Sequence, residues 1–285
     1  MKILLIGKNG QLGSEIDKQA INRKHEIHSF GHEELNIADS GKVKIRIESI
    51  SPDVVINASA FHNVPVCEEQ PDQAFLVNTI ALKPITEICS DKNIKFVHFS
   101  TDYVFDGLKG SRYVEEDKQN PVQMYGISKA AGEYVVLHNS STSIVIRSSG
   151  VYGGKTGSRS KKGNFALNLL EKAKTERTIE VASEQIVNPT YAVDLAKATL
   201  DLLKHKDISG IYHLVNEGYC SWADFAKEIV RCRGIGTKII PVDRGGMAGT
   251  LRRPLFSALK NTRAAKLGVK LPTWKDAIRR YLLTL

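Results

Sequence analysis

The N-terminal 22 residues constrain the fold more than any other stretch of the chain. A mostly apolar run, Lys2–Ile6, leads into the segment Gly7-Lys-Asn-Gly10-Gln-Leu-Gly13, which precedes a predicted helix over 14–22. Such a run is typical of a strand buried on both faces of a parallel sheet. Glycine permits the tight turn at position 7, close approach of backbone to a pyrophosphate at 10, and helix–strand packing at 13. Because a helix N-terminus attracts phosphate, the segment predicts a dinucleotide site.

Apolar runs and predicted helices alternate through the first half of the chain. Strands are expected at 25–30, 54–56, 95–99 and 143–147, with helices between them, one of which runs continuously over 71–92. The alternation predicts an α/β fold of the Rossmann type, a doubly wound parallel sheet. Beyond Gly150 the rhythm breaks, although the segments 188–196 and 210–215 can return to the sheet. We expect a dinucleotide-binding domain at 1–152 plus 184–215, and a smaller mixed α/β substrate-binding domain at 153–183 plus 216–285.

Two motifs carry candidate catalytic chemistry. Ser100-Thr101-Asp102 follows the run 95–99, so the Thr101 hydroxyl is expected at the carboxyl edge of the sheet, where open α/β folds bind ligands. Tyr125 and Lys129 are four residues apart in a helix predicted from Met124, and therefore share one face. A nearby ammonium lowers the pKa of a phenol, which makes the pair a candidate general acid/base. One Tyr-x-x-x-Lys is expected by chance in a chain of this composition, so the surrounding motifs must decide its meaning.

Composition excludes several classes of function. No apolar run approaches the ~20 residues of a membrane span, and Ile3–Ile6 is too short for a secretory signal. The four cysteines are far apart, which predicts reduced thiols in a cytoplasmic protein and neither a zinc site nor a disulfide framework. The net charge of +9 is spread along the chain, so no nucleic acid is expected as a partner. We interpret the basic stretch 155–162 as a solvated loop, with steering of an anionic substrate as the alternative.

The tip of the second predicted strand bears on the choice of cofactor. NAD-selective sites usually place Asp or Glu there, on the hydroxyls of the adenine ribose. Here the tip reads Ser29-Phe-Gly-His32, and Glu33 and Glu34 follow only after it. The sequence therefore favours NADP(H), with NAD(H) as the alternative. Asp39 and Ser40 open the next predicted helix, so they either cap it or contact the adenine end of the cofactor.

Together these motifs resemble one family, the extended short-chain dehydrogenase/reductases, and within it the dTDP-4-dehydrorhamnose reductase group. The resemblance runs nearly from end to end, and the run Ser100-Thr-Asp-Tyr-Val-Phe-Asp-Gly107 is particularly specific to this group. The other motifs that carry it are Gly7–Gly13, Pro52–Ala58, Tyr125–Lys129, Asn164-Phe165, Asn188–Tyr191, Gly210–Leu214, Ser221-Trp222 and Arg252–Pro254.

The resemblance implies an activity and a set of site residues. A nicotinamide cofactor would deliver hydride to the C4 carbonyl of a nucleotide-linked 4-keto-6-deoxy sugar, as in the conversion of dTDP-4-dehydrorhamnose to dTDP-L-rhamnose. Tyr125 would donate the proton, Lys129 would hold the nicotinamide ribose and lower the phenol pKa, and Thr101 would bond the carbonyl oxygen. The implied cofactor contacts are Gly7, Gly10, Gln11, Leu12, Gly13, Asp39, Ser40, Ala58, Ala60, Phe61, His62, Tyr125 and Lys129. The implied substrate contacts are Thr101, Asp102, Gly150, Asn164 and Arg253.

Three positions depart from the family pattern. Gly150 stands where the family usually carries a Trp that packs on the sugar nucleotide, His62 replaces a Thr, and Val64-Pro65 replaces Val-Asp. We hypothesise that Arg159, Lys161 or Lys162 attracts the diphosphate in place of the missing ring.

The sequence leaves alternatives open for the oligomeric state of the protein and for its function. Some members of the family bridge a homodimer through a metal on acidic residues. Glu15 is present here, but Lys197 stands where an Asp is expected, so no metal is predicted and a homodimer is only a candidate assembly. Two other functions stay open: a non-catalytic NADP-binding regulatory subunit, resembling that of methionine adenosyltransferase, and a sugar-nucleotide epimerase/reductase.

Overall fold

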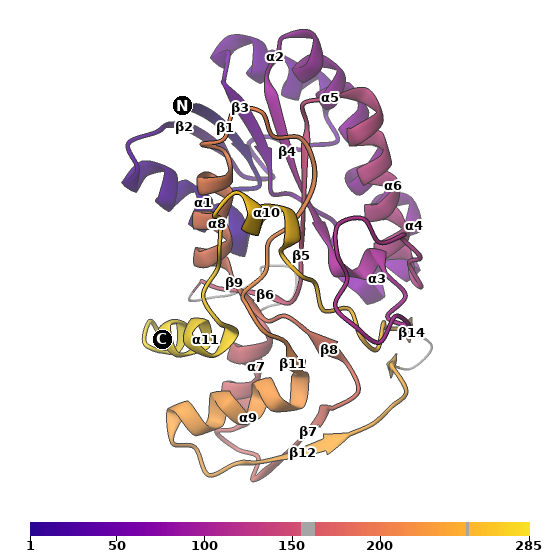
Figure 1. Ribbon diagram of the computed structural model, residues 1–285, viewed down its shortest axis with the longest axis vertical. Coiled ribbons are helices and arrows are strands. Elements are labelled where there is room, and N and C mark those ends of the chain that lie inside the picture. Colours follow the sequence, from indigo (N-terminus) through magenta and orange to yellow (C-terminus); the bar gives the residue numbers. More distant parts are fainter. Residues whose placement is uncertain (155–162, 249–250) are drawn as a thin grey trace.

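A six-stranded sheet of parallel strands forms the centre of the protein. The computed structural model describes residues 1–154, 163–248 and 251–285. The strand order is β10-β5-β4-β3-β1-β2, and every neighbouring pair is parallel. The predicted α/β Rossmann-type fold is therefore confirmed (Figure 1). The strands are β1 (Lys2–Ile6), β2 (Glu26–Phe30), β3 (Val54–Asn57), β4 (Lys95–Thr101), β5 (Ile144–Ser148) and β10 (Gly210–His213).

Helices cover both faces of this sheet because side chains alternate along each strand. Ile3 and Leu5 of β1 belong to a core that includes α1 (Gln11–Asn22) and α8 (Ala192–Leu202). Leu4 and Ile6 belong to the core of the opposite face, with α2 (Ser40–Ile50), α5 (Leu82–Asp91) and α6 (Met124–Asn139). All four β1 side chains are at most 1% exposed, and burying each contributes roughly 1.5–3 kcal/mol. The strand is thus anchored on both sides, which fixes the loop that follows it.

The segment between β3 and β4 differs from the single helix expected over 71–92. The chain forms α3 (Val64–Glu69), α4 (Pro71–Phe75), a π-helical turn η1 (Leu76–Ile80) and only then α5. The Asn78 side chain bonds the backbone of Phe61 through both its amide oxygen and its amide nitrogen, at 2.9 Å each. A Cβ on Gly132 of α6 would lie 2.1 Å from the Asn78 carbonyl oxygen. These tertiary contacts favour the wider turn, and π-turns inside helices often mark functional sites.

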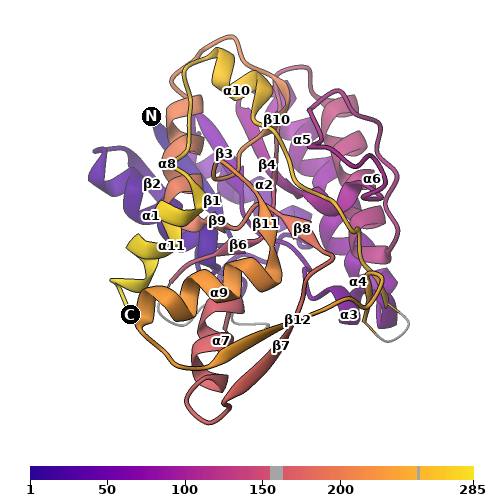
Figure 2. The ribbon, with the colours of Figure 1, turned by 60° about the horizontal axis from the view of Figure 1, so that its bottom comes forward.

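A second lobe lies at the carboxyl edge of the sheet (Figures 1 and 2). It has its own hydrophobic core, built around Tyr152, Phe225 and Tyr281. Its main elements are α7 (Phe165–Lys172), β7 (Thr178–Ala182), α9 (Trp222–Arg233), β12 (Lys238–Val242) and α11 (Trp274–Leu282). The remaining short elements of the whole chain are η2 (Asp102–Val104), β6 (Val151–Tyr152), β8 (Ile186–Val187), β9 (Thr190–Tyr191), β11 (Cys220–Ser221), β13 (Met247–Ala248), β14 (Leu251–Arg252) and α10 (Thr262–Lys266).

The chain passes between the two lobes several times. As expected, 210–213 returns to the sheet as β10, while β7 pairs with β12 away from it. These pairings support the division at residues 152, 184 and 215, which stays a prediction. Within the described ranges, no helix is both long and apolar enough to cross a lipid bilayer.

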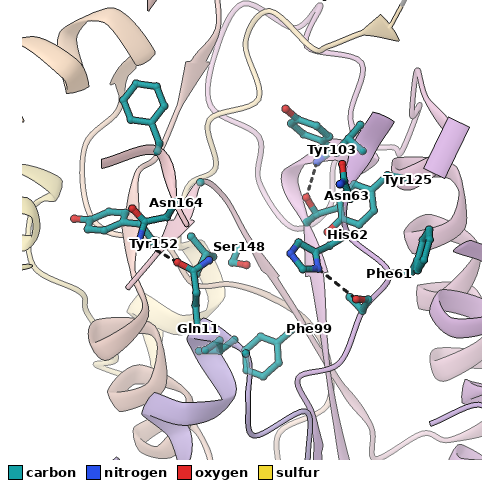
Figure 3. Close-up of a pocket in the computed structure, with 18 of the residues that line it drawn as sticks. Gln11, Phe61, His62, Asn63, Phe99, Tyr103, Tyr125, Ser148, Tyr152 and Asn164 are labelled. Atoms are coloured by element: carbon teal, nitrogen blue, oxygen red, sulfur yellow. Dashed lines mark hydrogen bonds between the residues drawn. The ribbon is translucent and has the colours of Figure 1, made fainter. Parts of the chain in front are cut away.

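One carboxamide joins the lobes. Gln11 opens α1, and its Oε1 accepts hydrogen bonds from the Gly153 backbone N–H at 3.0 Å and from Asn164 Nδ2 at 3.2 Å. Asn164 also caps α7, where its Oδ1 accepts from the Leu167 N–H, and it donates to the Tyr281 hydroxyl at 2.9 Å. The loop after β1 is therefore hydrogen-bonded to the second lobe (Figure 3).

Candidate active site

A large cavity lies between the carboxyl edge of the sheet and the second lobe, with a volume of about 1090 Å³. Open α/β sheets bind ligands at this position, where the strand order reverses, and here the reversal falls between β1 and β3. Figure 3 shows Gln11 and Asn164 on one wall, and Tyr125 and His62 on the opposite wall. The volume suits a dinucleotide together with a second ligand.

The β1–α1 loop forms a cradle for phosphate at one end of this cavity. Gly7 has φ +93°, and a Cβ there would lie 2.8 Å from the Ala58 carbonyl carbon. A Cβ on Gly13 would lie 2.1 Å from the Gly7 carbonyl oxygen, so only glycine allows α1 to start this close to the loop. Among the described residues, no side chain caps the N-terminus of α1. Its first N–H groups and dipole therefore fit a pyrophosphate.

Most predicted cofactor residues line the cavity, and three do not. The lining ones are Gly7, Gly10, Gln11, Leu12, Ala58, Ala60, Phe61, His62, Tyr125 and Lys129. Gly13 is instead buried beneath the loop, where it serves packing. Asp39 and Ser40 lie outside the lining, so the predicted contact with the adenine end is not supported. The reason is that the Asp39 carboxylate caps α2, accepting from the Lys42 N–H at 3.0 Å.

The two glutamates after β2, Glu33 and Glu34, differ in whether their carboxylates are free to contact a ligand. Glu34 accepts from the Gly31 N–H at 2.7 Å and pairs with Lys8 at 2.8 Å, so its carboxylate is held by its own loop. His32 and Glu33 line the cavity and are exposed. His32 and Glu33 therefore offer an imidazole and a carboxylate to a ligand at this end of the cavity.

Thr101 and Tyr125 meet at the carboxyl end of β4. The Thr101 hydroxyl accepts from the Tyr103 N–H at 3.2 Å, which caps η2, and donates to Asp102 Oδ1 at 3.1 Å. Its side chain also hydrogen-bonds the Tyr125 phenol, which favours the phenolate. Desolvation outweighs this bond and raises the pKa of Tyr125 well above its usual value, so the phenol keeps its proton at neutral pH.

Lys129 lies on the same face of α6 and contacts a buried histidine. Its Nζ lies 2.8 Å from His98 Nε2, and both side chains are at most 1% exposed. Burial lowers the pKa of Lys129 to about 7, although the Glu133 carboxylate raises it. Burial dominates the pKa of the phenol in this arrangement, and the lowering by a Lys129 ammonium stays a prediction.

Asp102 lines the cavity, but hydroxyl groups engage its carboxylate. Oδ2 accepts from Ser149 Oγ at 2.9 Å and from Ser257 Oγ at 2.5 Å, while Oδ1 accepts from Thr101. Burial raises the pKa of this carboxyl to about 6 despite these bonds. The side chain thus ties the end of β4 to the end of β5 and to the second lobe, and its place beside the sugar stays a prediction.

The predicted substrate positions Gly150, Asn164 and Arg253 also line the cavity. Gly150 has φ +53°, and a Cβ there would lie 3.4 Å from the Trp222 ring and 3.1 Å from the Asn188 carbonyl oxygen. Trp222 packs on Phe165 with ring centroids 4.7 Å apart, and both rings line the cavity. The aromatic surface at this wall therefore comes from α9 and α7. Arg159, Lys161 and Lys162 lie outside the described residues.

Several site residues escaped prediction. Asn57, His98 and Asn78 hold the catalytic groups and the 58–62 loop from beneath, and each was interpreted only as part of a strand or helix. Trp222 and Phe165 appeared in the family motifs, but no local signal indicated that their rings line the cavity. In the described ranges no cluster of three or more His, Cys, Asp or Glu could hold a metal ion. The Asp194 carboxylate is paired with Arg280 at 2.6 Å and accepts from Asn216.

Comparison with known proteins identifies one consistent group. A family model described as the RmlD substrate binding domain matches residues 1–285. The spore coat polysaccharide biosynthesis protein SpsK of Bacillus subtilis is 36% identical over 99% of this chain and 96% of its own length. A crystal structure of a dTDP-4-dehydrorhamnose reductase from Clostridium acetobutylicum is 34% identical, covers 100% of both chains and has a TM-score of 0.92. A dTDP-4-dehydrorhamnose reductase from Bacillus anthracis, in complex with NADP, is 29% identical with a TM-score of 0.92 and 100% coverage of both chains.

Proposed function

The chain belongs to the RmlD family, an NAD(P)H-dependent oxidoreductase group, and we propose that it reduces the C4 carbonyl of a nucleotide-linked 4-keto-6-deoxy sugar. The proposed reaction is the conversion of dTDP-4-dehydrorhamnose to dTDP-L-rhamnose, with NADPH as the preferred cofactor. The observation that carries the proposal is the convergence of Thr101, Tyr125 and Lys129 on one wall of a cavity whose far end is a phosphate cradle. The names of the relatives support the sugar nucleotide as the substrate class.

The residues of the chain supply the proton and the orientation. When bound, NADPH supplies hydride from its dihydronicotinamide ring to the carbonyl carbon. Tyr125 gives its phenolic proton to the carbonyl oxygen, so one O–H bond breaks as that of the product alcohol forms. The raised pKa of Tyr125 keeps this proton in place until the oxygen becomes basic. Thr101 orients the phenol through their hydrogen bond and is itself fixed by Asp102 and the Tyr103 N–H.

NADPH is the preferred cofactor because the end of β2 offers little to a ribose diol. Glu34 is already bonded to Gly31 and Lys8, which leaves Glu33 as the carboxylate that lines the cavity there. His32 adds a polar ring that a 2′-phosphate can contact. The NADP complex of the Bacillus anthracis relative supports the same choice.

The test is turnover of the purified full chain with dTDP-4-dehydrorhamnose, followed by loss of NADPH absorbance. Formation of dTDP-L-rhamnose, checked by chromatography, is the expected result, and the UDP-linked 4-keto sugar is the matched comparison for the nucleotide. If the protein turned over only a different 4-keto sugar nucleotide, the proposed substrate would be wrong but the proposed reaction, reduction of a C4 carbonyl, would stand. Cofactor binding without oxidation of NADPH by any 4-keto sugar nucleotide would contradict the enzyme and favour a regulatory subunit.

A further inference from the structure

A buried chain of three side chains lies beneath the catalytic tyrosine. Asn57 ends β3, His98 lies beside it in register on β4, and Lys129 projects from α6. Asn57 Nδ2 lies 3.0 Å from His98 Nδ1, and His98 Nε2 lies 2.8 Å from Lys129 Nζ. All three side chains are at most 1% exposed, so water does not compete for these hydrogen bonds.

The donors and acceptors of this chain permit one arrangement of protons. The Ser59 backbone N–H, which can only donate, lies 3.0 Å from Asn57 Oδ1, and the Ser59 hydroxyl lies 2.6 Å from the same oxygen. These contacts fix the Asn57 amide, so its NH₂ group faces His98. His98 Nδ1 must then accept, and the proton of the neutral ring must sit on Nε2.

The Nε2–H group determines the charge of Lys129. An ammonium at Nζ has no lone pair and would place N–H against N–H at 2.8 Å. An imidazolium fails as well, because its Nδ1–H would point at the Asn57 NH₂ group. A neutral amine accepts from Nε2–H and avoids both of these donor–donor contacts.

We propose that His98 is a positioning residue that holds Lys129 as a neutral amine, through an Nε2–H tautomer that Asn57 and the Ser59 backbone select. The hydrogen-bond arrangement itself does not depend on the proposed reductase function. Its role in catalysis rests on that function, because Lys129 belongs to the proposed catalytic residues. Lys129 must take a proton from solvent onto Nζ before it can act as a cation, and that N–H bond forms as the bond from His98 Nε2 is released. The charge at the centre of the site thus depends on whether Lys129 has taken up this proton.

The electrostatic surroundings agree with this assignment. Burial holds the pKa of His98 well below its usual value, and burial lowers the pKa of Lys129 to about 7. Glu133, one turn further along α6, opposes the second shift, but Arg147 neutralises its carboxylate at 2.7 Å. The ionisable residues of α6 are Tyr125, Lys129, Glu133, Tyr134 and His138. Those of the elements packed against it are Cys67, Glu68, Glu69, Asp72, Lys83, Glu87, Cys89, Asp91, Lys95, His98, Asp102, Tyr103 and Arg147.

The first measurement uses the wild-type chain alone. With ¹⁵N-labelled histidine, ring-nitrogen chemical shifts report the tautomer of each of the 8 histidines. We expect His98 to show a protonated Nε2 and a bare Nδ1 that do not titrate as an imidazole between about pH 5.5 and 8.5, the range around the ordinary histidine pKa. The Lys129 side-chain signals are expected to titrate near pH 7, apart from the other lysines. A protonated Nδ1, or a Lys129 that titrates with the exposed lysines, overturns the proposal.

Two variants separate this role from a merely structural one. Asn57→Asp presents an acceptor to Nδ1, so it is expected to move the ring proton from Nε2 to Nδ1 and to raise the Lys129 titration well above pH 7. Ser59→Ala is the matched control, because it removes a hydroxyl from the same amide oxygen but keeps the backbone N–H that fixes the amide. Tautomer and Lys129 titration are expected to stay unchanged in the control. If Asn57→Asp leaves both unchanged, or fails to fold while the wild type shows Nδ1–H, the proposal is wrong.

Discussion

The ion pair between Glu133 and Arg147 offers a demanding test of how the site is supported. Both side chains are 1% exposed, and the guanidinium donates to the carboxylate from Nε at 3.0 Å and from Nη2 at 2.7 Å. Gln119 and Ser100 also donate to Glu133. His213, 3.5 Å from the guanidinium, cannot compensate its charge, because an imidazole is either neutral or positively charged.

Glu133→Gln leaves the shape of this cluster and removes the only carboxylate bonded to Arg147 in the described parts of the chain. An uncompensated buried charge costs about 3–5 kcal/mol, a large share of the roughly 5–15 kcal/mol that stabilises a folded domain. At about 2 °C per kcal/mol for a chain of this length, the midpoint of thermal unfolding is expected to fall by about 6–10 °C. Denaturant unfolding followed by circular dichroism measures the same loss of free energy.

Two controls sharpen the result. Glu171→Gln removes an equivalent charge from a pair with Lys174 that is 68–73% exposed, and is expected to cost less than about 0.5 kcal/mol. The double variant Glu133→Leu with Arg147→Met removes both buried charges and is expected to recover most of the lost stability. If Glu133→Gln lies within about 1 kcal/mol of the wild type, the reasoning that a buried charge is left unpaired is refuted.

Three further predictions concern the site itself. Tyr125→Phe keeps the ring and removes the proton, so turnover is expected to fall by about 10²-fold or more while NADPH still binds; near-wild-type turnover contradicts the assignment. Because Glu34 is held by its own loop, kcat/KM with NADPH is expected to be at least that with NADH, and a clear preference for NADH would place Glu33 on the ribose. Asp102 has a folded-state pKa of about 6, above its ordinary value, so the folded protein binds this proton more tightly than the unfolded chain. Wild type is therefore expected to lose up to about 3 kcal/mol relative to Asp102→Asn as pH rises from about 4 to 6, and a pH-independent difference in unfolding free energy argues against it.

Much of the sheet was predictable from sequence because its central strands, such as β1, β3, β4 and β5, are buried on both faces. Continuous apolar runs such as Lys2–Ile6 have few alternatives to a parallel strand, and the glycines after β1 are required by contacts as close as 2.1 Å. The spacing of Tyr125 and Lys129 likewise follows from helix geometry alone.

The features that could not be predicted depend on contacts between residues far apart in the chain, which the local sequence does not indicate. The composition of the segment around Asn78 predicts a regular α-helix, but the structure has a π-helical turn there. The contact that favours this turn is with Phe61, 17 residues away, and so cannot be inferred from the local sequence. His98 reads as one polar residue in an apolar strand, and nothing nearby indicates that Lys129 would meet it. The sequence predicted two alternative roles for Asp39, capping of the helix or contact with the adenine end of the cofactor, and the structure shows the cap.

The Gln11 carboxamide links the two binding halves thermodynamically. It belongs to the loop that cradles phosphate, yet its oxygen is bonded to Gly153 and Asn164 of the opposite lobe. A ligand that changes these hydrogen bonds from one lobe therefore changes the binding free energy of a ligand in the other lobe. This coupling free energy is the same in both directions. Cofactor affinity measured with the sugar nucleotide present divided by that without it must equal the converse ratio for the sugar nucleotide. Replacing Gln11 with alanine removes the shared oxygen and is expected to bring both ratios toward unity together.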